Sequence, residues 1–377
     1  MGALDGVRVI ELAGIGPGPF CGMMLSDMGA EVIRVDRAGA VKGGDPSQPP
    51  VGVIERGRRS IGVDLKSSEG VGVLLSLVEG ADMIFEGFRP GVAERLGVGP
   101  EECLARNPAL VYGRMTGWGQ EGPYASAAGH DINYIALAGA LAHMGRADSG
   151  PVPPLNLVGD FGGGGMYLAF GMVCALFSAR STGQCQVVDA AMVDGAASLM
   201  GFFHGFLATG FHKPERGVNT LDTGAHFYDV YQCLDGSYIS LGSIEPQFYA
   251  EMVEKLGLDS ERFAPQFDQT QWPALKAEIA TVVATKTRDQ WDAILAGSDV
   301  CYAPVLTIDE AVVHPHNVER GTFVESAGLT QPGPAPRFSE TPGAISRPPA
   351  HPGQHTDEIL IEAGLDVEAL RASGAVA

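Results

Sequence analysis

Basic side chains are scarce in this sequence of 377 residues: 25 lysines and arginines stand against 45 aspartates and glutamates, giving a formal net charge of −20. A field of that sign repels phosphate at long range, which excludes general binding to nucleic acids or to anionic membranes. An anionic ligand would therefore need a local basic pocket. At 45% hydrophobic and 19% charged residues, the composition is typical of a globular protein. The length favours two domains, or one large α/β domain with an insertion.

Cysteine motifs and targeting signals are also lacking. The six cysteines are scattered, with no C-x-x-C pair and no histidine at metal-ligand spacing, so neither a zinc site nor a disulfide scaffold is indicated. We expect free thiols in a reducing cytoplasm, because Met1–Asp5 lacks the features of a signal peptide and the last three residues are not a peroxisomal signal. Phe161–Ala179 is uncharged, but four glycines open this stretch and no neighbouring span accompanies it, which predicts a buried core helix rather than a membrane span.

The first half of the chain alternates short β-rich runs with helical patterns. This alternation predicts an α/β fold with a doubly wound, Rossmann-like parallel sheet. The expected strands are 7–12, 30–35, 60–63, 81–85, 110–115 and 186–188, and the expected helices are 20–28, 67–78, 100–105 and 190–208.

The pattern changes near Gly210. A turn at Asp235-Gly236 between two β-rich runs predicts a hairpin, and the helical patterns that follow predict a smaller α+β domain. The proline-rich stretch 331–355 predicts an extended crossing segment, and a last helix over 356–372 is expected to pack back on the first domain. The helices expected in the second half are 247–255, 272–284 and 288–296. The expected domains are a large one over 1–188, a helical linker over 189–225, a small domain over 226–315, and a return segment over 316–377.

Three glycines follow the first expected strand at Gly14, Gly16 and Gly18, with Asp36 about twenty residues later, as in a dinucleotide-binding fingerprint. Pro19 stands where that fingerprint requires glycine, and prolines lack the amide that would bind a pyrophosphate. The segment is therefore interpreted as a tight turn from strand to helix.

Basic residues follow several of the expected strands. Arg37, Lys66 and Arg89 each come at a strand end, and the carboxyl ends of parallel strands share one edge of a sheet. Taken singly, each is typical of a solvated surface charge. Taken together, they favour an anion pocket suited to a phosphate-rich ligand.

Two short segments offer an imidazole and a carboxylate beside glycines. His130 and Tyr134 lie four apart at an expected helix start, and Asp160 precedes a run of glycines at another. A structural histidine and a simple N-cap are the alternatives. Read as a pair, the two groups favour proton transfer at carbon, with the amides of the glycine-rich helix start stabilising negative charge. Glu245, ahead of a later helix, is a further candidate or merely a surface acid.

Ordered motifs along the chain resemble those of the family III coenzyme A transferases. They run from residue 6 to about residue 250, and the rest of the chain is similar in character. The motifs are 7–12 with Gly16-Pro17, 58–66, 87–91, 117–123, 129–131 and 156–160.

Within that family the likeness is greatest to members that racemise 2-methylacyl-CoA thioesters. The resemblance implies an isomerase that removes a proton from one face of the α-carbon and returns one to the other through an enolate. His130 and Asp160 would be the acid/base groups, and Glu245 would hold His130 by a hydrogen bond. No metal and no nucleotide redox cofactor is implied; the only such group is the CoA moiety of the substrate.

The same resemblance implies the residues that hold CoA and an assembly. The family fold is an interlocked homodimer, so Glu245 would act across the dimer. The implied CoA-binding residues are Arg37, Val63, Asp64, Leu65, Lys66, Gly87, Phe88, Arg89, Arg95, Gly129, His130, Asp131, Ile132, Asn133 and Tyr134.

Two other functions remain open at this point. A family III CoA transferase would use Asp160 as a nucleophile and form an acyl-aspartyl anhydride, for which His130 is unnecessary. A non-catalytic acyl-CoA-binding protein would need no acid/base pair. The sequence leaves the acyl chain undetermined: a branched fatty acid, a steroid side chain or an aryl acyl group would all suit an apolar surface.

Overall fold

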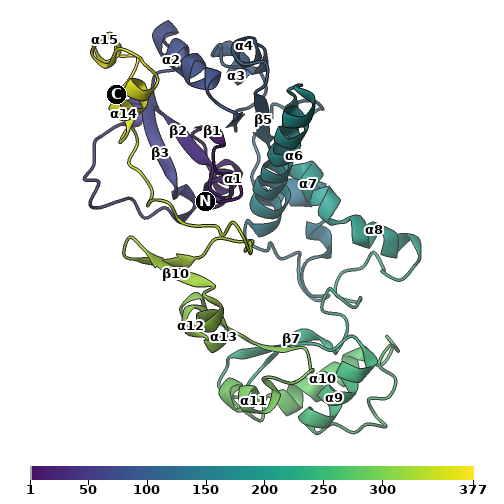
Figure 1. Ribbon diagram of the computed structural model, residues 1–377. Coiled ribbons are helices and arrows are strands. Elements are labelled where there is room, and N and C mark those ends of the chain that lie inside the picture. Colours follow the sequence, from purple (N-terminus) through teal and green to yellow (C-terminus); the bar gives the residue numbers. More distant parts are fainter. Residues whose placement is uncertain (1) are drawn as a thin grey trace. The chain divides into compact units, whose positions relative to one another are not determined.

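The computed structural model describes residues 2–377 and divides the chain into two compact units (Figure 1). The large unit comprises Met1–Ala138, Leu155–Leu199 and Pro315–Ala377, and the small unit comprises Gly139–Pro154 and Met200–His314. The sequence placed all of 1–188 in one domain, whereas contacts group Gly139–Pro154 with the small unit.

A six-stranded parallel sheet is the centre of the large unit, as the alternating pattern predicted. Its strand order, β3-β2-β1-β4-β5-β6, reverses direction between β1 and β4. In such a sheet, ligands bind in the crevice outside the carboxyl ends of the strands at this point. The strands are β1 (Arg8–Leu12), β2 (Glu31–Arg37), β3 (Arg58–Val63), β4 (Met83–Glu86), β5 (Val111–Thr116) and β6 (Val187–Ala191).

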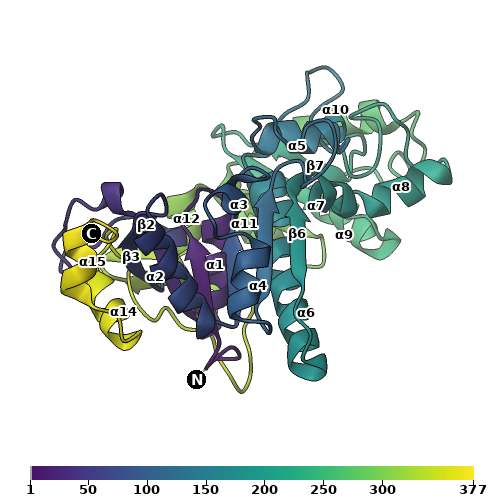
Figure 2. The same ribbon diagram turned by 90° about the horizontal axis from the view of Figure 1, so that it is seen from above.

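Helices cover both faces of this sheet, because alternate strand residues point to opposite faces. Ile10 of β1 belongs to a core shared with α2 (Ser68–Glu79) and α14 (Thr356–Glu362). Its neighbour Val9 belongs to the opposite core, shared with α1 (Pro17–Asp27) and α6 (Met166–Thr182). Figure 1 shows α14 beside β3, and Figure 2 shows α6 beside β6. The remaining elements of the large unit are α3 (Val92–Arg95), α4 (Pro100–Arg106), α5 (Asp131–Leu137), α7 (Met192–Leu199), α13 (Pro315–Arg320), the hairpin β10 (Phe323–Ser326) and β11 (Leu329–Pro332), and α15 (Val367–Ser373).

Two long helices expected from the sequence are each divided in the structure. The expected helix 190–208 begins as the end of β6 and continues as α7 and then α8 (Gly201–Ala208), separated where one unit gives way to the other. The expected helix 356–372 is α14 followed by α15, because Gly364 has φ +71° and Asp366 caps a new helix by accepting a bond from the Ala369 amide at 3.0 Å. As predicted, α14 packs on the sheet of the large unit.

The apolar stretch expected as a buried helix is a nine-residue π-helix, Leu157–Gly165, continued by α6. By length and composition, Leu157–Thr182 could cross a membrane, a test that core helices also pass, and 44% of its most apolar window is buried. One face, with Leu168 and Met172, is buried as predicted. The prediction is wrong for the other face, where Phe170 is 71% and Phe177 75% exposed.

The small unit is an antiparallel sheet of order β7-β8-β9 packed on helices. The hairpin predicted around Asp235-Gly236 is confirmed as β7 (Tyr228–Gln232) and β8 (Tyr238–Gly242), and β9 (Tyr302–Val305) pairs with β8. The predicted α+β character is therefore correct. Its helices, besides α8, are α9 (Pro246–Leu256), α10 (Trp272–Val283), α11 (Arg288–Leu295) and α12 (Ile308–Val313).

Candidate active site at the carboxyl edge of the sheet

A cavity of about 670 Å³ lies where the strand order reverses. The segments that follow β1, β4 and β5 all line it, which is the arrangement that the crossover rule predicts for a ligand site. Parts of α5, of the π-helix and of α7 complete the lining, so the whole cavity belongs to the large unit. Both candidate acid/base residues, His130 and Asp160, line this cavity.

His130 is the residue before α5, and its side chain lines the cavity. Its backbone amide donates to Asn133 Oδ1 at 3.0 Å, and its carbonyl oxygen accepts from the Asn133 amide at 2.8 Å. This reciprocal bonding starts the helix at Asp131 and leaves the imidazole exposed to the cavity.

Asp160 lies in the π-helix and lines the same cavity. Partial burial raises the pKa of its carboxyl group, a bond from Asn156 opposes that rise, the charge of Asp131 adds to it, and His130 opposes it. The Asn156 side-chain amide donates to Asp160 Oδ2 at 3.1 Å. A π-helical turn is a frequent local feature of functional sites.

The structure thus brings His130 and Asp160, 30 residues apart in the sequence, to one cavity. Gly16 lets the turn before α1 come close to Asp160: a Cβ atom there would lie 3.2 Å from Asp160 Oδ2, and its φ of +68° favours glycine. The turn predicted at this point therefore forms part of the wall.

Asp131 has a place that the sequence did not predict. Its buried carboxylate accepts bonds from the backbone amides of Gly159 at 2.6 Å and Asp160 at 2.8 Å. A Cβ atom on Gly159 would lie 2.5 Å from Asp131 Oδ2, so glycine permits this approach. These two amides are therefore bonded within the protein, and the expectation of open amides concerns the glycines that follow Asp160.

The other implied CoA-binding residues are distributed in and around the cavity. Arg37, Arg89 and Tyr134 line it, and Arg37 pairs in the sheet with the buried Val63. Lys66 is exposed beyond the end of β3. The residues among them that line the cavity are Arg37, Gly87, Phe88, Arg89, Gly129, His130 and Tyr134; those that do not are Val63, Asp64, Leu65, Lys66, Arg95, Asp131, Ile132 and Asn133.

An aromatic wall beside His130 is a further feature. Trp118 packs edge-on against Tyr134 with ring centroids 4.7 Å apart, and against Tyr124 at 5.2 Å. Burial raises the pKa of Tyr134, and the carboxylate of Asp160 adds to the rise. Trp118 was noted only as part of a motif, and nothing in its spacing indicates this contact.

Glu245 belongs to the small unit, where it directly precedes α9 and is exposed. Its carbonyl oxygen accepts a bond from the Tyr249 amide at 2.9 Å. Its bond to His130 stays a prediction.

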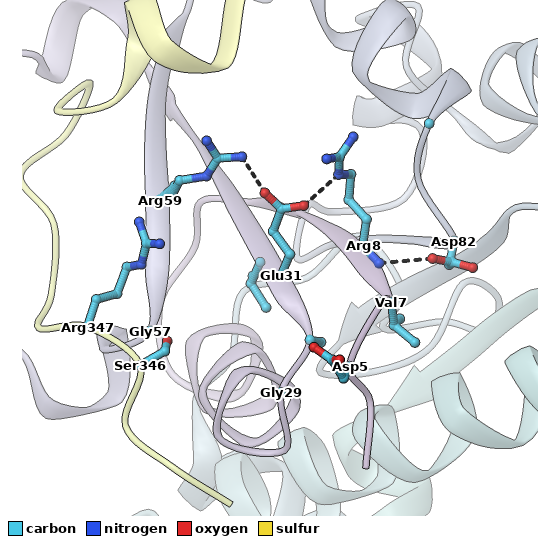
Figure 3. A pocket seen from close by; sticks show the side chains of 14 residues that line it. Asp5, Val7, Arg8, Gly29, Glu31, Gly57, Arg59, Asp82, Ser346 and Arg347 are labelled. Carbon is cyan, nitrogen blue, oxygen red and sulfur yellow. Dashed lines mark hydrogen bonds and ion pairs between the residues drawn. The ribbon is translucent and has the colours of Figure 1, made fainter. Parts of the chain in front are cut away.

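A second cavity, of about 470 Å³, lies at the opposite, amino edge of the same sheet (Figure 3). Here Glu31, at the start of β2, bonds both Arg8 and Arg59, at the starts of β1 and β3. Arg59 also bonds Glu358 at 2.7 Å and Glu362 at 2.7 Å, both on α14. These side chains bond to one another, so ion pairs hold the elements together here, and the carboxyl-edge cavity is the better candidate site.

Comparison with known proteins gives the family of the chain. Residues 4–356 match the family CoA-transferase family III. The chain is 47% identical to an alpha-methylacyl-CoA racemase of Mus musculus, over 97% of this chain and 94% of the relative. It is 32% identical to a succinyl-CoA--D-citramalate CoA-transferase of Chloroflexus aurantiacus, over 95% of this chain and 93% of the relative. A solved CAIB/BAIF family structure from Brucella suis matches with a TM-score of 0.82 at 27% identity, covering 96% of this chain and 99% of that one. The chain therefore belongs to CoA-transferase family III.

Proposed function

We propose that this protein is a racemase that inverts the α-carbon of 2-methylacyl-CoA thioesters by transferring protons between two bases. One observation carries the proposal: an imidazole, His130, and a carboxylate, Asp160, line one cavity at the crossover of a parallel sheet. Supporting it, the identity to a racemase, 47%, is well above the identity to a transferase, 32%.

The cavity has both cationic and apolar lining residues, as such a substrate requires. Arg37 and Arg89 line the part formed by the ends of β2 and β4, where their guanidinium groups suit the phosphates of CoA. The apolar wall with Trp118 suits the acyl end. In a chain with a net charge of −20, these cations give the local attraction that a polyanionic ligand requires.

The proposed reaction follows from the chemistry of a thioester. The carbonyl group acidifies the neighbouring C–H, so one base removes that proton and an enolate forms. The conjugate acid of the other base then delivers a proton to the opposite face. The raised pKa of Asp160 suits a carboxyl group that must both accept and donate a proton. No metal or redox cofactor is needed for this sequence of steps.

We further propose that the protein is a cytoplasmic, interlocked homodimer in which Glu245 of one subunit orients His130 of the other. The exposed apolar face of α6, with Phe170 and Phe177, supports burial against another chain. Light scattering on the purified protein measures the mass of the assembly, and a monomer at micromolar concentration would contradict this part.

The alternative within the family is a CoA transferase. The 32% identity to a transferase and the position of Asp160 in the cavity favour it as the second candidate. In that case Asp160 would attack the thioester carbonyl and release CoA thiolate, leaving an acyl-aspartyl anhydride. The thiolate would then attack the Asp160 carbonyl of this anhydride, which releases the first carboxylic acid and leaves an aspartyl-CoA thioester. A second carboxylate would attack that thioester, expel the thiolate to form a new anhydride with Asp160, and receive CoA when the thiolate attacks its own carbonyl.

One experiment separates the two functions. The protein is incubated with a (2R)-2-methylacyl-CoA in deuterated water, and the product is analysed for configuration and for deuterium at the α-carbon. Racemisation gives both epimers with deuterium incorporated. Retention of configuration and of hydrogen, together with transfer of CoA to added carboxylic acids, would instead establish the transferase.

A further inference from the structure

The side chain of Asp131 joins the two segments that carry the proposed proton-transfer groups. Asp131 is the first residue of α5 and follows His130 directly. Its Oδ2 atom accepts bonds from the amides of Gly159 and Asp160, at 2.6 Å and 2.8 Å. One carboxylate thus connects the backbone next to His130 with the backbone of Asp160 itself, across 29 residues of sequence.

This connection is built rather than incidental. Asp131 is 5% exposed, and a buried carboxylate is costly unless donors satisfy it. The donors are amides at the start of the π-helix, which have no partner within a helix. Gly159 leaves no room for a side chain at this point, since a Cβ atom would meet Asp131 Oδ2 at 2.5 Å.

The second oxygen of Asp131 strengthens the case for a special role. Oδ1 is buried and has no hydrogen-bond partner among the described residues. A purely structural cap is better served by asparagine or serine, which carry no charge into the interior. The charge lies beside Asp160, whose carboxyl group it disfavours in the ionised form.

We propose that Asp131 is a positioning residue, which holds the Asp160 backbone in register with His130 through its two amide bonds. This inference rests on the proposed racemase function, in which His130 and Asp160 must both reach the same α-carbon. Proton transfer at carbon depends steeply on such geometry: a displacement of about 1 Å can cost about 100-fold in rate.

Two substitutions separate geometry from charge. In Asp131→Ala both amide bonds are lost, and we expect kcat to fall about 100-fold while KM changes less than about threefold, because Asp131 does not line the cavity. In Asp131→Asn the side-chain oxygen can still accept both bonds, so kcat should stay within about fivefold of wild type.

The asparagine variant should also shift the pH profile. The charged groups that act on Asp160 are Asp131 and His130, and Asp160 and Arg89 both act on the neighbouring Tyr134. Removing the negative charge of Asp131 favours the ionised form of Asp160 and lowers its pKa. In the direction of the reaction in which Asp160 removes the proton, the acid limb of kcat/KM should therefore move to lower pH. A cap with only a structural role would leave that limb in place.

A matched control comes from the small unit. Asp222 is also buried and accepts bonds from the backbone amides of Gly217 at 2.9 Å, Asn219 at 2.7 Å and Gly224 at 3.3 Å, and from the Asn219 side-chain amide at 2.7 Å. Asp222→Asn likewise keeps an oxygen that can accept bonds from amides, and it should leave the acid limb where it is in wild type. An equal shift of the limb in both variants would overturn the proposal.

A second measurement does not depend on activity. Amide hydrogen exchange followed by mass spectrometry reports the protection of peptides that cover the π-helix. Asp131→Ala should expose the amides at its start to faster exchange, whereas Asp131→Asn should not. If the wild-type protein fails to exchange the α-hydrogen of the substrate with solvent, the proposed function fails. The amide exchange of the protein then decides by itself whether Asp131 is a positioning residue. The positioning role is overturned if Asp131→Ala leaves the protection of these amides unchanged, or if it leaves kcat unchanged in an active enzyme.

Discussion

The two edges of the six-stranded sheet use charged side chains in opposite ways. At the amino edge, Arg59 is bonded to three carboxylates that belong to β2 and α14. At the carboxyl edge, Arg37 and Arg89 line an open cavity together with an exposed imidazole. Ion pairs in the amino-edge cavity hold elements together, whereas Arg37 and Arg89 form no ion pair among the described residues and are available to a ligand. Arginines that are bonded to carboxylates stabilise the fold, and arginines that line a cavity without such bonds can bind a ligand.

The largest expected effect comes from substitutions at the carboxyl edge, which should lower the reaction rate. Replacing His130 or Asp160 by alanine should lower the rate of α-hydrogen exchange at least 10³-fold, because each removes one of the two groups that transfer the proton. Deuterium incorporation measured by mass spectrometry gives this rate. Circular dichroism is expected to show an unchanged fold. A variant that retains more than a tenth of the wild-type rate would exclude that residue from the reaction.

At the amino edge the same kind of change should affect stability rather than rate. Arg59→Met removes a guanidinium group that is 6% exposed and leaves Glu31, Glu358 and Glu362 without it. We expect a loss of about 2 kcal/mol in the free energy of unfolding, less than for a fully buried pair because the carboxylates are partly exposed. Urea denaturation measures it.

Two further observations keep that prediction falsifiable. Arg59→Met should leave kcat within about twofold of wild type, since Arg59 does not line the carboxyl-edge cavity. Bonds from Arg59 lower the pKa of Glu362 in the folded protein. Their contribution is therefore present above the unfolded pKa of Glu362 and is lost as the pH falls through the folded value. An activity loss as large as that of the His130 variant would erase the distinction between the edges.

The sequence predicted the sheet well because its signal is local. Each strand is a short apolar run between turns, and the helix pattern that separates strands implies parallel pairing. The crossover then places the ends of β1, β4 and β5 around one cavity, which is how residues as distant as Gly16 and Asp160 come together. The position of the site is thus a consequence of topology.

Pairings between distant side chains could not be predicted in this way. Arg59 meets Glu358 and Glu362 across 299 and 303 residues, and no local period connects them. Asp131 was implied as a CoA contact by resemblance, whereas its carboxylate faces the amides of the π-helix. Asn156 lies four residues before Asp160, a helical spacing that places both on one face, so this contact had a signal that was available.

The cations of the carboxyl edge can be tested by their effect on substrate affinity. Arg89→Ala should raise KM for the acyl-CoA about tenfold, since a charge-assisted bond to phosphate is worth about 1.5 kcal/mol, and kcat should change little. Steady-state kinetics at several salt concentrations checks this, because the wild-type KM should rise with salt more steeply than that of the variant. Arg106→Ala, which removes an exposed ion pair with Glu79, is the control. A tenfold rise in KM for that variant as well would contradict a specific phosphate contact.

The smallest expected effect concerns the bond from Asn156 to Asp160. This bond favours the ionised carboxylate, so Asn156→Ala should raise the pKa of Asp160 further and move the acid limb of kcat/KM to higher pH. The loss of kcat/KM near neutral pH should be about fivefold, because one hydrogen bond is lost and the group stays in place. Asn107→Ala is the matched control: its side chain donates to the carbonyl oxygens of Val78 and Ala81, so it should lower stability without moving the limb. Asn156 lowers the pKa of Asp160, and Asp131 raises it. Asn156→Ala and Asp131→Asn should therefore shift the acid limb in opposite directions. A shift in the same direction for both would mean that the limb reports a group other than Asp160.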